Sequence, residues 1–184
     1  RGRAGAAHVA LDSAYARLSV PERERLSSLS RLLPPRSRTY FDTLSTLGKQ
    51  QLEQSYFSIA NPTLLAEGNL VWDEFRARVA FAELMWTNEQ VNVRGVDSDR
   101  GEVIVRWGPP DNVWSTGPDA LGIISLMWLY RPTGFLITFR MPPTYGTAFV
   151  SPSERSDVLE PEMHLRPVRW DNLPLFRKGI DSLP

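Results

Sequence analysis

The 184-residue sequence predicts an α+β fold, with N-terminal helices packed on a small antiparallel sheet and a proline-rich arm extending from the sheet. Two observations support this. Apolar residues recur at helical spacing through residues 1–94, and they form short alternating, β-branched or aromatic runs through residues 95–141. Residues 142–184 hold seven of the 15 prolines, which favours an extended C-terminal arm over the interior of a sheet.

The composition excludes several classes of function. Without cysteine the chain has no disulfide, thiolate metal site or cysteine nucleophile. The 21 basic and 21 acidic residues balance, which argues against a nucleic-acid partner or a polybasic membrane anchor. The longest apolar run, Ile123 to Tyr130, is far shorter than the roughly 20 residues of a membrane helix. We therefore expect no transmembrane segment in these residues.

Five helices are expected before residue 95. The first covers residues 4–18, and the second begins after Ser19, a good N-cap with Pro21 in the first turn, and ends at Pro34-Pro35. The third covers about 36–46, and the fourth ends at Asn61-Pro62. The clearest apolar face predicts the fifth helix, over residues 70–87.

Strands are expected after residue 95. Glu102 to Trp107 alternates apolar and polar residues, which predicts a strand that ends at the turn Gly108 to Asp111. Val113 and Trp114 begin a short strand, and Ile123 to Tyr130 forms a hairpin with Phe135 to Met141. These predict three or four antiparallel strands. Aromatic residues on or beside them could stack a ligand, but an aromatic core under helix 70–87 is the expectation: Trp107, Trp114, Trp128 and Tyr130.

Histidine chemistry has few candidates. The two histidines are His8, near the N-terminus, and His164, in the arm, so a Ser-His-Asp triad would require two peripheral segments to meet. Two histidines cannot form a three-histidine zinc site. We expect neither a catalytic triad nor a metal or cofactor site.

Asp97, Asp99 and Glu102 are spaced like the start of a calcium loop. The register of an EF-hand fails, because Gly101 stands at the fifth position and Gly108 at the twelfth, where a bidentate glutamate is required. We expect Asp97 and Asp99 to brace the turn that enters the strand and to pair with Arg100 or Arg106.

The segment Gly95 to Asp111, GVDSDRGEVIVRWGPPD, resembles the signature of the GWxTD-motif domain family of bacterial envelope proteins. Residues 74–82, 128–130 and 134–139 resemble the flanks of that signature, and the resemblance covers about residues 30–141. Val96 and Ser98 stand where the signature has Trp and Thr. The resemblance implies a bacterial, periplasmic or envelope-associated protein and implies no particular reaction.

The scarcity of catalytic groups and this resemblance predict a non-catalytic envelope interaction or scaffold module. One version is an accessory subunit on the aqueous face of a membrane-embedded respiratory or photosynthetic complex. In the arm, apolar anchors alternate with arginine and give the candidate partner-binding residues: Leu165, Arg166, Arg169, Trp170, Leu175 and Phe176. The arm could instead wrap its own domain.

An enzyme of another class stays open as the alternative. It would be a hydrolase acting on envelope polymers, with acid and base drawn from four carboxylates: Asp97, Asp99, Glu102 and Asp111. The sequence spacing does not place two of them across a cleft.

Overall fold

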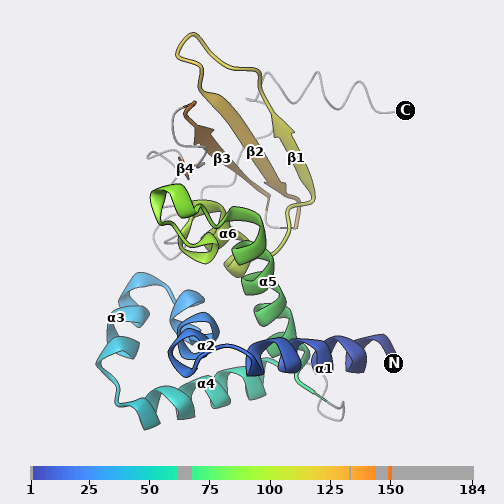
Figure 1. Ribbon diagram of the computed structural model, residues 1–184, viewed down its shortest axis with the longest axis vertical. Helices are drawn as coiled ribbons and strands as arrows, with labels where there is room; N and C mark the ends of the chain where they lie inside the picture. The colour runs from blue at the N-terminus through green and yellow to red at the C-terminus, as the bar shows by residue number, and fades with distance from the viewer. Residues whose placement is uncertain (1, 62–67, 133, 144–148, 151–184) are drawn as a thin grey trace.

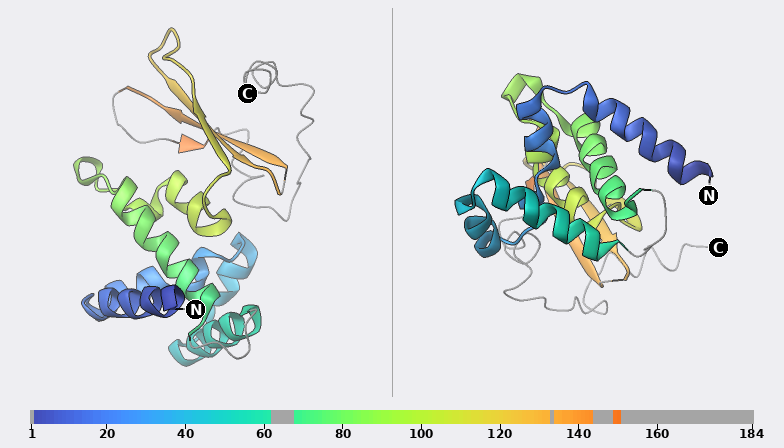
Figure 2. Two further views of the ribbon diagram at one scale, coloured as in Figure 1. Left: turned by 90° about the vertical axis from the view of Figure 1, so that its right-hand side faces the viewer. Right: turned by 90° about the horizontal axis from the view of Figure 1, so that it is seen from below.

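The computed structural model describes residues 2–61, 68–132, 134–143 and 149–150 and has the predicted α+β fold (Figure 1). Helices α1 to α4 lie at one end of the molecule and the sheet at the other. Helix α5 runs from the helical end toward the sheet, and α6 lies between them (Figures 1 and 2). The α-helices are α1 Gly2–Ala16, α2 Val20–Ser27, α3 Pro35–Thr43, α4 Thr46–Ala60, α5 Leu70–Trp86 and α6 Asp99–Trp107.

Five helices form before residue 95, as predicted, although Ser19 donates its hydroxyl to Glu22 and does not cap the backbone of α2. Asn69 caps α5, with its Oδ1 accepting hydrogen bonds from the backbone N–H groups of Val71 and Trp72. Helix α2 begins after Ser19 as predicted, but it ends at Ser27, well before Pro34. The reason is Ser28, which turns the backbone into an extended conformation and caps a new 3-10 turn, η1 Leu29–Arg31.

The strand predicted over Glu102 to Trp107 is wrong, because these residues belong to helix α6. Ser98 is its N-cap, and Gly108, at a φ of 78°, ends it in a conformation that favours glycine. Successive residues Val103, Ile104 and Val105 are all buried. The helix lies between two hydrophobic clusters, so its apolar residues occupy a wide arc of its surface.

The sheet is antiparallel with strand order β1-β2-β3-β4. The predicted hairpin forms β2 Ile124–Tyr130 and β3 Phe135–Met141, and the short predicted strand forms β1 Asn112–Ser115. Strand β4 Phe149–Val150 was not predicted, because it lies within the proline-rich region. It pairs with Phe139 and Arg140 at one end of β3.

Helix α6 joins two hydrophobic clusters. Val105 packs in a helical cluster with residues of α1 to α5, whereas Val103 and Ile104 pack in a second cluster against β2 and β3. The partly buried Trp86, at the end of α5, packs against both clusters. Trp128 and Tyr130 are buried in an aromatic cluster as predicted, but α6 covers this cluster, and Trp86 is the α5 residue that packs against it.

Candidate functional site

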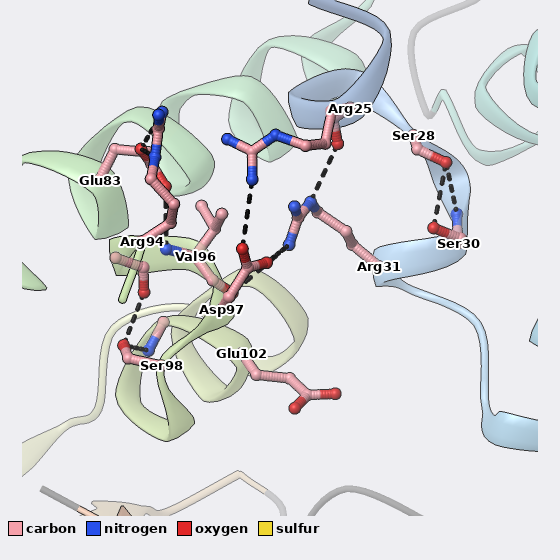
Figure 3. A network of polar contacts seen from close by, with 12 residues as sticks. Arg25, Ser28, Ser30, Arg31, Glu83, Arg94, Val96, Asp97, Ser98 and Glu102 are labelled. Atoms are coloured by element: carbon pink, nitrogen blue, oxygen red, sulfur yellow. Dashed lines mark hydrogen bonds and ion pairs between the residues drawn. The ribbon is translucent and has the colours of Figure 1, made fainter. Parts of the chain in front are cut away.

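Two glycines allow close backbone packing in the segment Gly95 to Asp111, Gly95 against α5 and Gly101 against the turn that begins at Gly95. A Cβ atom at Gly95 would lie 2.0 Å from the carbonyl oxygen of Ala82, and one at Gly101 would lie 1.9 Å from the carbonyl oxygen of Gly95. The buried Ser98 hydroxyl donates to the Gly95 carbonyl at 2.6 Å and accepts from the Gly101 N–H at 3.1 Å (Figure 3). Close backbone packing is therefore one role of this segment.

Glu83 holds the start of the same segment to α5. Its carboxylate accepts a hydrogen bond from Arg94 Nε at 2.7 Å and another from the Val96 backbone N–H at 3.1 Å (Figure 3). This carboxylate also raises the pKa of the Arg94 guanidinium. Since Thr87, at the end of α5, also accepts from the Gly95 N–H at 2.9 Å, the turn η3 Gly95–Asp97 is held to α5 at two points.

Asp97 links the segment to the N-terminal helices. Its carboxylate forms ion pairs with Arg25 and Arg31 (Figure 3), at 3.2 Å from Arg25 Nη1 and 2.9 Å from Arg31 Nη1. The prediction that Asp97 pairs with Arg100 or Arg106 is wrong, because η3 directs it toward α2 and η1. Arg106 pairs instead with Glu102, one helical turn away, at 3.0 Å.

A cleft of about 850 Å³ opens beside Asp97, lined by α2, α3, α4 and the segment that begins at Gly95. Basic side chains in its lining are Arg23, Arg25, Arg31, Arg38 and Lys49. Acidic side chains in it are Glu24, Asp42, Glu53, Asp97 and Glu102. Equal numbers of both signs leave the cleft without a net charge that would select an anionic or cationic ligand.

Glu53 is a candidate acid in this cleft that the sequence did not reveal. Burial raises the pKa of its carboxyl group, even though its Oε1 accepts a hydrogen bond from the Leu29 N–H at 3.0 Å. A glutamate with a raised pKa in a cleft is a common arrangement for a general acid. No local sequence motif marks Glu53, because its surroundings come from distant parts of the chain.

The structure brings two of the four predicted catalytic carboxylates into one cleft. Asp97 and Glu102 both line it, and both contact arginines. Asp99 is buried in the first turn of α6. Asp111 accepts a hydrogen bond from the Arg131 N–H at 2.7 Å and thereby ties the start of β1 to the end of β2. Asp99 and Asp111 are therefore placed to support the fold.

His8 takes part in a charged network between α1 and α5. Its Nδ1 lies 2.8 Å from Asp73, and its Nε2 lies 3.3 Å from Asp12. The buried Arg76 pairs with both carboxylates, at 2.7 and 2.6 Å, and its hydrogen bond lowers the pKa of Asp12. Each ring nitrogen thus faces a carboxylate, and the network holds α1 in place. The other histidine, His164, lies outside the described residues.

A second surface surrounds Trp86, where α5 meets α6. Three large apolar side chains near the end of α5 are exposed and share one face of the helix: Phe81 by 45%, Leu84 by 86% and Met85 by 58%. The Trp86 ring packs on Phe81 and on Trp128, with centroid separations of 5.5 and 5.6 Å. We call Phe81, Leu84, Met85, Trp86 and the adjacent Arg100 the Trp86 surface.

A pocket of about 460 Å³ borders the Trp86 surface, and Met85, Trp86 and Arg100 belong to its lining. The Arg100 guanidinium carbon lies 5.3 Å from the centroid of the Trp86 ring at the side of this pocket. Its rim includes Glu89 and Gln90 of the 3-10 turn η2 Glu89–Val91. The sequence does not indicate this site, because the apolar face of helix 70–87 predicts a core position for Trp86, which does pack on both clusters, and Arg100 is expected to pair with Asp97 or Asp99.

The predicted partner-binding residues of the arm lie outside the described residues: Leu165, Arg166, Arg169, Trp170, Leu175 and Phe176. Within the described ranges, no group of three or more histidine, aspartate or glutamate side chains is placed to hold a metal ion. No helix in the part of the chain that the structure describes combines the length and the apolarity needed to cross a membrane.

Comparisons with known proteins give no further indication of function. No protein-family model matches the chain, and searches of curated proteins and of solved structures find no match. The functional argument therefore depends on the residues and geometry described above.

Proposed function

We propose that the protein is a non-catalytic interaction module of the bacterial envelope and that it binds a protein partner through the Trp86 surface. The observation that carries this proposal is the run of exposed apolar side chains at Phe81, Leu84 and Met85. A single exposed leucine is ordinary on a protein surface, whereas neighbouring large apolar residues beside Trp and Arg resemble the centre of a protein interface.

The envelope location comes from the resemblance of Gly95 to Asp111 to the GWxTD signature. In this proposal the partner belongs to a membrane-embedded complex, and the module docks on its aqueous face as an accessory subunit. The balanced charge of the chain supports attachment through a protein, because a neutral protein gains little from anionic lipid headgroups.

The contacts of the carboxylates support a non-catalytic role. Asp97 and Glu102 contact arginines, Asp111 accepts from a backbone N–H, and each nitrogen of His8 faces a carboxylate. All of these contacts join one element of the fold to another or brace a helix, and each gives its group a structural role.

A hydrolase acting on envelope polymers is the second candidate, and Glu53 is the observation that favours it. A carboxyl with a raised pKa shares the 850 Å³ cleft with Asp97 and Glu102, as a general acid would with a base. In that case Glu53→Gln would abolish the release of soluble fragments from purified cell-wall material. If the protein is a binding module, neither the wild type nor the Glu53→Gln variant would release soluble fragments.

Site-specific photo-crosslinking in cells that produce the protein tests the proposed interface. A benzophenone amino acid replaces Leu84, and the matched control carries it at Val113, which is 53% exposed on β1. We expect a covalent adduct of one defined mass with an envelope protein from position 84 and none from position 113. Equal adducts at both positions, or none at position 84, would overturn the proposed interface.

A further inference from the structure

Arg100 is a half-buried cation without a counter-ion among the described residues. Its Nε is buried and has no hydrogen-bond partner. The nearby Arg94 and Arg106 differ, since each contacts a glutamate. Desolvation of a charged group costs free energy unless a partner compensates for it, so an unpaired guanidinium beside a pocket indicates a missing anion.

The Trp86 ring compensates for part of that cost. It lies 5.3 Å from the guanidinium carbon of Arg100, a cation–π contact that does not use the hydrogen-bonding capacity of the terminal Nη groups. Burial lowers the pKa of Arg100, although a guanidinium keeps its charge at physiological pH. The planar guanidinium of Arg100 can therefore bind a carboxylate by donating two parallel hydrogen bonds to it.

The rest of the pocket favours an anion with a single charge. Arg100 is the cation in its lining, and the exposed Glu89 lies at the rim, so a doubly charged phosphate would be poorly neutralised. Met85 and Trp86 add apolar walls, and the Gln90 amide adds a polar group at the rim. This combination fits a carboxylate carried on a short methylene chain.

We propose that the pocket beside Trp86 binds the carboxylate of an acidic side chain presented by the protein partner, with Arg100 as its counter-ion. This inference depends on the proposed function, because it names the chemistry of the partner at the same surface. The methylene groups of the acidic side chain contact Met85 and Trp86, and apolar neighbours of that side chain in the partner cover Leu84.

Two short peptides test the carboxylate on the full chain. Both are acetylated and amidated, so that they carry no terminal charge, with sequences Ala-Leu-Glu-Leu-Ala and Ala-Leu-Gln-Leu-Ala. Nuclear magnetic resonance of the ¹⁵N-labelled protein follows the side-chain N–H signals of Arg100 and Trp86 during each titration. We expect the glutamate peptide to shift both signals and to bind about tenfold more tightly than the glutamine peptide.

Two variants separate the guanidinium from general electrostatics. Arg100→Lys keeps the charge but loses the planar donor edge, and it should remove most of the preference for glutamate. Glu89→Gln, at an exposed rim position, should strengthen binding of the glutamate peptide. Circular dichroism confirms that each variant is folded. Equal binding of the two peptides to the wild-type protein would overturn the carboxylate pocket.

The crosslinking experiment distinguishes this inference from the proposed function. If the partner adduct at position 84 forms equally well in the Arg100→Lys variant, the surface binds a protein, but the pocket does not bind a carboxylate of that protein. If no adduct forms at position 84 in the otherwise wild-type chain, the proposed interface itself is wrong.

Discussion

Gly95 approaches α5 so closely that a Cβ atom on it would lie 2.0 Å from the carbonyl oxygen of Ala82. That distance is too short for any side chain, and the atoms in the way belong to the backbone of a helix. The contact fixes η3 against α5 and, through Ser98, the start of α6. The position of Gly95 therefore controls how α6 is placed between the two cores.

Gly95→Ala should destabilise the protein by about 3 kcal/mol or more, because α6 must move away from α5 and open its buried contacts. Urea denaturation followed by circular dichroism measures this loss. Gly5→Ala is the matched control, since nothing lies within 4 Å of a Cβ atom at that position of α1. The control should raise stability by about 0.5 to 1 kcal/mol through helix propensity. Similar effects at both positions would contradict the packing role of Gly95.

Ser98→Ala should cost more than Asp97→Asn, although the two residues are neighbours. The buried Ser98 hydroxyl makes two backbone contacts, so its loss should cost about 1 to 2 kcal/mol at any salt concentration. The Asp97 side chain is 47% exposed, so its ion pairs should be worth at most about 1 kcal/mol and less in high salt. Denaturation in low and high salt distinguishes the two, and the reverse order would show that Asp97 is the main tether.

Glu53→Gln should raise stability near neutral pH and change it little in acid. Burial raises the pKa of Glu53 above the ordinary value of a glutamate, so the folded protein holds the proton more tightly than the unfolded chain does. The cost of ionising Glu53 in the fold is therefore absent at lower pH and grows as the pH rises through the folded pKa. A glutamine side chain avoids that cost and still offers an oxygen to the Leu29 N–H.

Melting temperatures at about pH 4 and about pH 7 test this dependence. Asp42→Asn serves as the matched control, because it removes an acidic group from an exposed position of the same cleft. A Glu53→Gln variant that is less stable than the wild type at neutral pH would show that the Glu53 carboxylate stabilises the fold.

Deletion of residues 151–184 separates a docking arm from one that wraps its own domain. For a docking arm, which is our expectation, the melting temperature should change by less than about 3 °C, and the crosslinked adduct at Leu84 should become weaker. The described strands, including β4, remain in the shortened chain. A large loss of stability would instead show that the arm packs on this domain.

Helical spacing predicted the helices before residue 95, and β-branched and aromatic runs predicted the hairpin, in which Trp128, Leu129 and Tyr130 are all buried. The alternation over Glu102 to Trp107 was misleading, because Val103, Ile104 and Val105 are buried in a helix between two clusters. Val103 and Val105 suggested a strand through spacing and β-propensity. Capping signals for a helix were present in Ser98 and Gly108, and tertiary packing outweighed the local preference for a strand.

The candidate sites were less predictable than the fold. The cleft combines residues near positions 23–53 with Asp97 and Glu102, and no local pattern reveals that distant segments will meet. At Trp86 the amphipathic pattern of α5 correctly indicated a helix but not that Leu84 would stay exposed on it. Exposure depends on which neighbours cover a face, and that is a property of the folded chain.

Helix α6 and the N-terminal helices contribute to the same hydrophobic cluster, and this affects how the chain folds as it is synthesised. Val105 completes a cluster that already includes Tyr15, about 90 residues earlier in the chain. At ordinary rates of translation, on the order of 5 to 20 s separate the two residues. During that interval the apolar faces of the first helices have no completed core to cover them, so the nascent chain must remain soluble until α6 has been made.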